Sequence, residues 1–155
     1  MSQIIESIDI DVPVRTAYDQ WTQFESFPRF MDGIERVEQV TDTTLEWTAR
    51  IGGAVRSWTA EITEQTPDQR IAWRATSGAE NAGVVTFHRL DDRRSRVTLQ
   101  LDVEPENIVE SVGDAIGLVQ RRAKGDLERF KTFIEDRGVA TGAWRGKVDQ
   151  PDVAG

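Results

Sequence analysis

The chain has 155 residues, 38% of them hydrophobic, which suits one domain with a substantial core and leaves too little for two. Its net charge of −8 would repel the phosphates of nucleic acid and of anionic lipid headgroups. The chain has no cysteine and no apolar run near the roughly 20 residues that span a bilayer, and its N-terminus does not resemble a signal peptide. We therefore expect a cytoplasmic protein that binds no nucleic acid and is not integral to a membrane.

The first third of the chain predicts one strand and two short helices. Hydrophobic and polar residues alternate over 3–10 (QIIESIDI), a period that is typical of a half-buried strand. Apolar residues then fall at helical spacing over 14–24, which predicts an amphipathic helix. The aromatic cluster at 24–31 predicts a second short helix that ends at Gly33.

A period of two returns over residues 34–104. Hydrophobic residues alternate with polar ones in successive runs, and turn residues separate some of these runs at 52–53, 67–68 and 91–92. Short connections between alternating runs predict an antiparallel meander with one covered face and one face in water.

The last regular element is a long amphipathic helix. From Ile108 to Ile134, hydrophobic residues recur every three or four positions over about seven turns. Gly138 is typical of the residue that follows a helix. Residues 139–155 lack periodicity and are rich in Gly, Asp and Pro, so we predict one domain over 1–138 followed by a flexible C-terminal tail.

Tryptophans on the covered face favour an incompletely filled interior. Trp47, Trp58 and Trp73 share the covered parity of successive strands. Large aromatic side chains can form the walls of an apolar pocket and offer an indole N–H to a ligand, although they can also fill a core. Gly113 and Gly117 weaken a helix interior by about 1 kcal/mol each, a cost that suits a helix moving as a lid.

Several stretches of sequence stand in register with motifs of a known family. They are VPVRTAYDQWTQFESFPRFMDGIERV, IGGAVRSWTAEITEQTPDQRIAWRATSG, GVVTFHRL, SRVTLQLDVEP and LERFKTFIEDRG. Together they resemble the polyketide cyclase/dehydrase-like family of the START-type helix-grip (SRPBCC) superfamily, and the resemblance covers about residues 3–138. It implies an α+β helix-grip fold, in which a curved antiparallel sheet of about seven strands wraps around one long C-terminal helix, with two short helices after the first strand.

The resemblance implies that a small hydrophobic molecule, such as a lipid, quinone or polyketide, binds in an internal cavity. Relatives include aromatase/cyclases, coenzyme Q-binding proteins and lipid-transfer domains, so the fold leaves the function open. One alternative is a polyketide cyclase or dehydratase that uses no metal or nucleotide cofactor. Another is a non-catalytic protein-interaction domain, whose exposed aromatic surface would include Trp144.

Polar residues on the covered face offer only weak catalytic candidates. His88 is the one histidine, and its parity is opposite to that of Phe87, so it should face solvent and serve neither a metal nor a Ser-His-Asp triad. Arg56 and Glu6 have the covered parity. In aromatase/cyclases that the chain resembles, a cavity arginine orients a poly-ketone, and Arg56 could bind an enolate oxygen in that way. The interpretation that we favour places the charged head of Arg56 in water near the turn at 52–53.

We assign no catalytic residue and expect neither a metal nor a cofactor, and the sequence leaves the oligomeric state open. The predicted cavity residues are Trp47, Arg56, Trp58, Trp73, Phe87, Leu99, Ile108, Val112 and Ile116.

Overall fold

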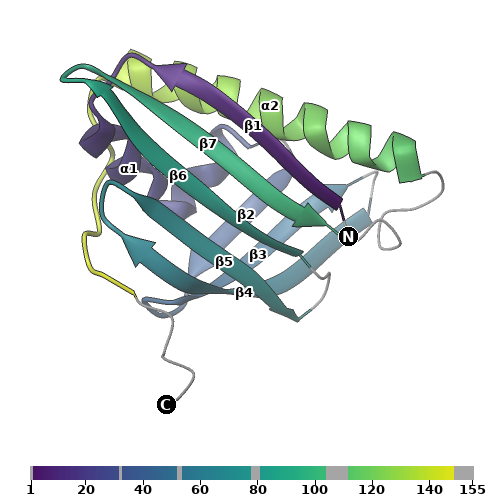
Figure 1. The fold of residues 1–155 in the computed structure, drawn as a ribbon. Coiled ribbons are helices and arrows are strands. Elements are labelled where there is room, and N and C mark those ends of the chain that lie inside the picture. Colours follow the sequence, from purple (N-terminus) through teal and green to yellow (C-terminus); the bar gives the residue numbers. More distant parts are fainter. Residues whose placement is uncertain (1, 32, 52–53, 78–80, 104–111, 149–155) are drawn as a thin grey trace.

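The fold is a curled antiparallel sheet with a long helix along one side (Figure 1). It was obtained as a computed structural model, which describes residues 2–31, 33–51, 54–77, 81–103 and 112–148. Seven strands lie in the order β1-β7-β6-β5-β4-β3-β2, so the first strand pairs with the last and the rest follow as a meander. The strands are β1 (Ser2–Ile10), β2 (Ile34–Gln39), β3 (Thr44–Ile51), β4 (Ala54–Thr66), β5 (Arg70–Ser77), β6 (Asn81–Asp91) and β7 (Arg94–Val103).

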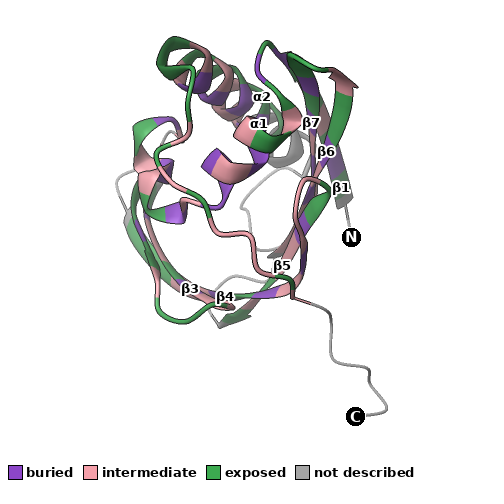
Figure 2. Cartoon of the chain, turned by 90° about the vertical axis from the view of Figure 1, so that its left-hand side faces the viewer, coloured by how far each residue is buried: buried purple, intermediate pink, exposed green. Residues whose placement is uncertain are grey.

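Alternation of side chains along the strands separates a covered face from a wet one, as the sequence predicts. On β6, Phe87 is buried while His88 is exposed. On β7, Val97 and Leu99 are buried while Arg96 is exposed. The concave face of the sheet therefore carries the apolar residues, and the helices lie over that face (Figure 2).

Three helices cover the concave face, in the predicted order. They are α1 (Val14–Trp21), the 3-10 helix η1 (Phe24–Arg29) and α2 (Val112–Arg137). Helix α1 packs on β6 and β7, η1 packs on β2, and α2 packs along β1. Helix α2 ends as predicted, because Gly138 takes a positive φ of 75° and its N–H donates to the carbonyl of Ile134 at 2.8 Å. The predicted beginning of this helix, including Ile108, lies outside the described residues.

One end of the space between sheet and helices is filled by aromatic side chains. Tyr18, Trp21, Phe30, Phe87 and Phe130 are all buried there, and we call this region the filled end. Trp21 contacts Phe130 at 4.9 Å between ring centroids, and Phe30 contacts Phe130 at 5.1 Å. Both pairs meet edge to face, a geometry that adds about 0.5–1.5 kcal/mol per pair beyond the burial of area.

Residues 139–148, the first part of the segment predicted as a flexible tail over 139–155, make hydrogen bonds to the domain. Residues 139–148, here called the strap, run along the outside of α1 toward the β4–β5 turn (Figure 1). The side chain of Gln20 exchanges two hydrogen bonds with Thr141, at 2.8 and 3.1 Å. Missing periodicity in the sequence does not exclude docking, because the partners of Thr141 and Val148 lie more than 50 residues away in the sequence. Residues 149–155 lie outside the described part of the chain.

Arg145 is the main anchor of the strap. Its guanidinium pairs with Asp19 on α1 and with Asp68 at the β4–β5 turn, the latter at 2.8 Å. Burial alone would lower the pKa of Arg145, but its hydrogen bonds to the two carboxylates outweigh this and raise the pKa. The same guanidinium lies over the ring of Tyr18, whose phenol accepts a hydrogen bond from the buried side chain of Gln65. Burial raises the pKa of that phenol, so Tyr18 stays neutral and acts in packing.

No helix in the described part of the chain is long and apolar enough to cross a membrane.

Candidate functional site

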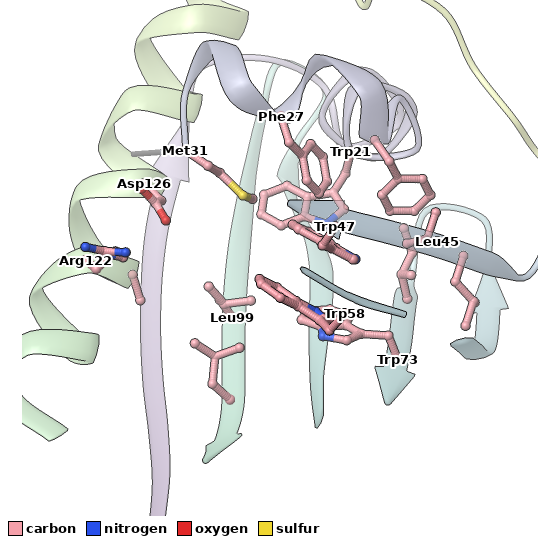
Figure 3. A pocket seen from close by; sticks show the side chains of 15 residues that line it. Trp21, Phe27, Met31, Leu45, Trp47, Trp58, Trp73, Leu99, Arg122 and Asp126 are labelled. Carbon is pink, nitrogen blue, oxygen red and sulfur yellow. The ribbon is translucent and has the colours of Figure 1, made fainter. Parts of the chain in front are cut away.

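A cavity of about 240 Å³ lies beyond the filled end, between the sheet and the helices (Figure 3). Side chains from α1, η1, four strands and α2 form its wall. Only two of the fifteen described lining residues are charged. The fifteen residues are Trp21, Phe24, Phe27, Met31, Leu45, Trp47, Trp58, Ile62, Ile71, Trp73, Leu99, Leu101, Arg122, Ala123 and Asp126.

Two tryptophans form one flat side of this pocket. Trp47 on β3 stands directly opposite Trp58 on β4 in the strand register, so their side chains leave the same face of the sheet. The two indoles are stacked, with ring centroids 5.8 Å apart and planes 6° from parallel. Both indoles lie on the wall of the pocket, as Figure 3 shows.

Trp73 belongs to the wall because its neighbour on β6 is a glycine. Trp73 pairs with Gly83 in the register, and a Cβ atom placed on Gly83 would lie 2.5 Å from the Trp73 ring. The indole therefore lies across the backbone of β6 in space that any other residue would occupy. This packing explains why β6 contributes no side chain to the described wall at this point.

The indole nitrogen of Trp47 is an unsatisfied donor. Trp47 Nε1 is buried and finds no hydrogen-bond acceptor among the described residues. A buried N–H without a partner costs about 1–3 kcal/mol, and native proteins rarely leave one unless a ligand or solvent completes it. This donor belongs to a tryptophan of the pocket wall.

Charge enters the wall from one helix. Arg122 and Asp126 stand one turn apart on α2 and are the two charged residues of the described wall. The Asp126 carboxylate is bound by Arg129, whose Nε also donates to the carbonyl of Phe30 at 2.9 Å. Arg122 makes no hydrogen bond or ion pair with any described residue, and its Nη1 lies 3.1 Å from the point where a Cβ on Gly33 would sit.

Part of the predicted cavity set lies together on this wall. The structure places Trp47, Trp58, Trp73 and Leu99 there. Phe87 lies instead in the filled end, edge-on to Tyr18 and Trp21. The remaining three predicted positions cannot be placed in the same way: Ile108 is outside the described residues, and Val112 and Ile116 lie in a part of α2 whose side chains are not described.

The two weak catalytic candidates lie elsewhere. Arg56 is exposed and is not among the described residues of the wall, although it stands opposite the buried Ala49. Arg56 is the third residue of β4, and its long side chain can reach water from this position near the strand end. Glu6 is half-buried on β1 and accepts a hydrogen bond of 2.8 Å from Gln120 of α2, so its carboxylate links strand and helix.

Sequence reasoning missed the contributions of the helices to the wall. The spacing of hydrophobic residues places Trp21 and Phe27 in the two predicted short helices, and it does not by itself assign Arg122 or Asp126 to the cavity. A signal for the charged pair exists: both flank Ala123, the smallest residue of the apolar stripe, four positions apart on the same side of α2. The small side chain of Ala123 leaves space between α2 and the sheet, and the charged side chains of Arg122 and Asp126 border that space.

Within the described ranges, no group of three or more His, Asp or Glu side chains is arranged to hold a metal ion.

The curled sheet, the long helix along it and the apolar pocket between them define a START-like protein of helix-grip fold. A START superfamily protein from Mycobacterium smegmatis superimposes with a TM-score of 0.69 over 87% of this chain and 95% of that one, at 15% identity. The Zhui aromatase/cyclase from Streptomyces sp. R1128 superimposes with a TM-score of 0.73 over 92% of this chain and 99% of its own, at 16% identity. At these identities the two structures show a shared fold.

Comparison of the sequence assigns the chain to a family within this fold. The model of the family described as "Polyketide cyclase / dehydrase and lipid transport" matches residues 10–132, and the chain belongs to this family. The chain is also 58% identical over 149 residues to a Streptomyces lincolnensis protein named "Uncharacterized 17.2 kDa protein in melC2-rnhH intergenic region", covering 96% of this chain and 99% of that one.

Proposed function

We propose that the protein binds a small, flat, hydrophobic molecule in the pocket between the sheet and α2. The observation that carries this proposal is the wall itself, in which four of the chain's five tryptophans surround one cavity. Tryptophans that only filled a core would pack against one another without leaving space. Here the stacked pair Trp47 and Trp58 borders the cavity, and aromatic walls of this kind suit a planar ligand.

The volume of the pocket limits the ligand. A dry protein cavity of about 150 Å³ holds one benzene molecule. The cavity here measures about 240 Å³, which suits a body of about two fused rings, with larger molecules requiring the wall to move. The unsatisfied N–H of Trp47 adds a polar requirement, because a ligand with a carbonyl or hydroxyl oxygen beside its rings could complete it.

A direct test uses 2-acetylnaphthalene, a neutral two-ring ketone, titrated into the full chain by isothermal calorimetry. We expect saturable binding with one site per chain. Trp58→Ala removes one of the two stacked indoles and should weaken binding at least about tenfold. Stacking of a flat ring, such as a nucleobase, on an aromatic side chain contributes about 1–3 kcal/mol to binding. Trp144→Ala is the matched control, because Trp144 belongs to the strap and not to the described wall, and it should change the Kd less than twofold.

Absence of saturable binding by the wild-type chain, with its fold intact by circular dichroism, would reject this function. Equal weakening by the Trp58 and Trp144 substitutions would mean that the ligand binds outside the pocket.

A second candidate is catalysis of a cyclase or dehydratase type, and the charged pair on the wall favours it. Closing a ring in a poly-ketone requires a group that stabilises an enolate oxygen and a group that moves a proton. Arg122 and Asp126 are the described wall residues with those capacities. Asp126→Asn should then abolish turnover of a poly-ketone substrate while leaving its Kd within about threefold. Retained turnover in that variant would exclude Asp126 from the chemistry.

A further inference from the structure

We propose that Arg122 is an anion-binding group of the pocket, and that the ligand carries a carboxylate or similar anionic oxygen group on a flat apolar body. This inference rests on the proposed function and narrows it, because it specifies the charge of the ligand. Three observations carry it: Arg122 has no hydrogen-bond or ion-pair partner among the described residues, Arg129 offsets the charge of the neighbouring Asp126, and the missing side chain of Gly33 leaves space for the guanidinium.

The first observation is that Arg122 differs from the other arginines that border the core. Arg129 is bound to Asp126 and to a carbonyl, and Arg145 is bound to two carboxylates. Arg122 is half-buried and lines an apolar pocket, yet no hydrogen bond or ion pair joins it to any described residue. A guanidinium has five N–H donors, and partial burial without an acceptor is costly for a charged group. An anion in the pocket would supply that acceptor.

The second observation concerns the one negative charge on the wall. Asp126 lies a single helical turn from Arg122, which would favour an intrahelical ion pair. Its carboxylate is instead held by Arg129 from the following turn. Arg129 therefore offsets the negative charge of Asp126, and among the described residues no ion pair compensates the positive charge of Arg122.

The third observation is the position of the Arg122 guanidinium beside Gly33. Gly33 takes a positive φ of 84° at the turn between η1 and β2, and a Cβ there would lie 3.1 Å from Arg122 Nη1. The absence of a side chain lets the guanidinium rest against this turn. One edge of the guanidinium is thus supported, which limits the entropy lost when an anion is bound.

Charge on the neighbouring surface is consistent with an anionic ligand. Arg29, Arg50 and Arg129 line a shallow hollow next to the pocket, and Met31 lines both. Arg50 is paired with Glu35 at 2.7 Å, while Arg29 is exposed. On a chain of net charge −8, this is the side from which an anion would be attracted to the pocket.

The experiment compares two ligands of the same shape and different charge, 2-naphthoate and neutral 2-acetylnaphthalene. Both are titrated into the full chain at pH 7.5, where the carboxylic acid is ionised. The wild-type protein should bind 2-naphthoate about 10- to 100-fold more tightly, the range expected for a charge-assisted hydrogen bond. Arg122→Gln should remove this preference, so that the Kd values of the two ligands come within about threefold of each other. Arg122→Lys should keep part of the preference, because it keeps the charge and loses the two-pronged geometry.

Arg121→Gln is the matched control. It removes the same charge from the adjacent, exposed position of α2, and it should leave the preference unchanged. Equal affinity of the wild-type chain for the two ligands would overturn the inference, as would a preference that survives in Arg122→Gln. In either case, binding of the neutral ligand would leave the proposed function intact. If neither ligand binds the wild-type chain, the proposed function fails and the inference fails with it.

Discussion

The two ends of the interior are built from the same kind of residue and differ in what that residue does. At the filled end, Trp21, Phe30 and Phe130 meet edge to face and leave no room between them. At the pocket, Trp47 and Trp58 lie parallel to each other, and both border a cavity. Aromatic content therefore does not distinguish a core from a binding site. The arrangement of the rings does, and it depends on what stands opposite them.

The difference has a local cause in the covering elements. Helix α1 inserts Tyr18 and Trp21 between β6 and α2, so the filled end receives side chains from three layers. At the pocket, α2 contributes the small side chain of Ala123, while the strands contribute large aromatic side chains, and the cavity lies between them.

The largest expected effect follows from opening the filled end. Phe130→Ala removes a ring that is 0% exposed and touches two other aromatic rings. We expect the free energy of unfolding to fall by about 3–5 kcal/mol, the usual cost of replacing a buried Phe or Trp with Ala. Trp58→Ala should cost less, because Trp58 is half-buried and already borders a cavity. Urea unfolding followed by circular dichroism measures both. Equal losses would contradict the contrast between the two ends.

The next effect comes from adding volume where none is free. Val97 is 0% exposed on β7 and stands opposite Phe87, so Val97→Phe must displace packed side chains. Overpacking of this kind should lower the free energy of unfolding by about 1–3 kcal/mol. The same urea titration checks it. A neutral or stabilising outcome would show that the filled end holds unused space.

The sequence predicts the elements and the covered face, and the reasons are local. Alternation along β7 and the three-to-four spacing of α2 depend only on neighbouring residues, and both are confirmed. Placement against distant partners is not local. The sequence puts Phe87 and Trp73 on the same face of the sheet. Phe87 fills the core because α1 packs over it, whereas Trp73 borders the pocket and lies beside Gly83. The strap escaped prediction for the same reason, since Arg145 finds its carboxylates at Asp19 and Asp68.

A smaller effect tests whether the strap supports the filled end. Arg145→Ala removes the guanidinium that Asp19 and Asp68 share. The side chain of Arg145 is 27% exposed. We expect a loss of about 1–2 kcal/mol in the free energy of unfolding, between the values for surface and buried charged hydrogen bonds. Arg15→Ala is the control: Arg15 also approaches Asp19, at 3.8 Å, but its side chain is 69% exposed, and its loss should change stability by less than about 0.5 kcal/mol. Binding of 2-acetylnaphthalene should stay within twofold in both variants. Similar losses from the two substitutions would mean that the strap adds nothing beyond a surface ion pair.

The smallest change in stability should come from filling the pocket itself. Leu101 lies four residues from Val97 on β7, shares its parity and lines the cavity. Leu101→Phe adds a ring to space that is already present, so the apolar area gained should offset the strain and keep the free energy of unfolding within about 1 kcal/mol of wild type. Ligand binding should respond in the opposite way, with at least a tenfold loss of affinity for 2-acetylnaphthalene, because the added ring occupies the volume that the ligand needs. Destabilisation as large as that of Val97→Phe would mean that the wall cannot accept a ring. Undiminished binding would place the ligand outside this cavity, and with it the whole distinction between the two ends would lose its functional meaning.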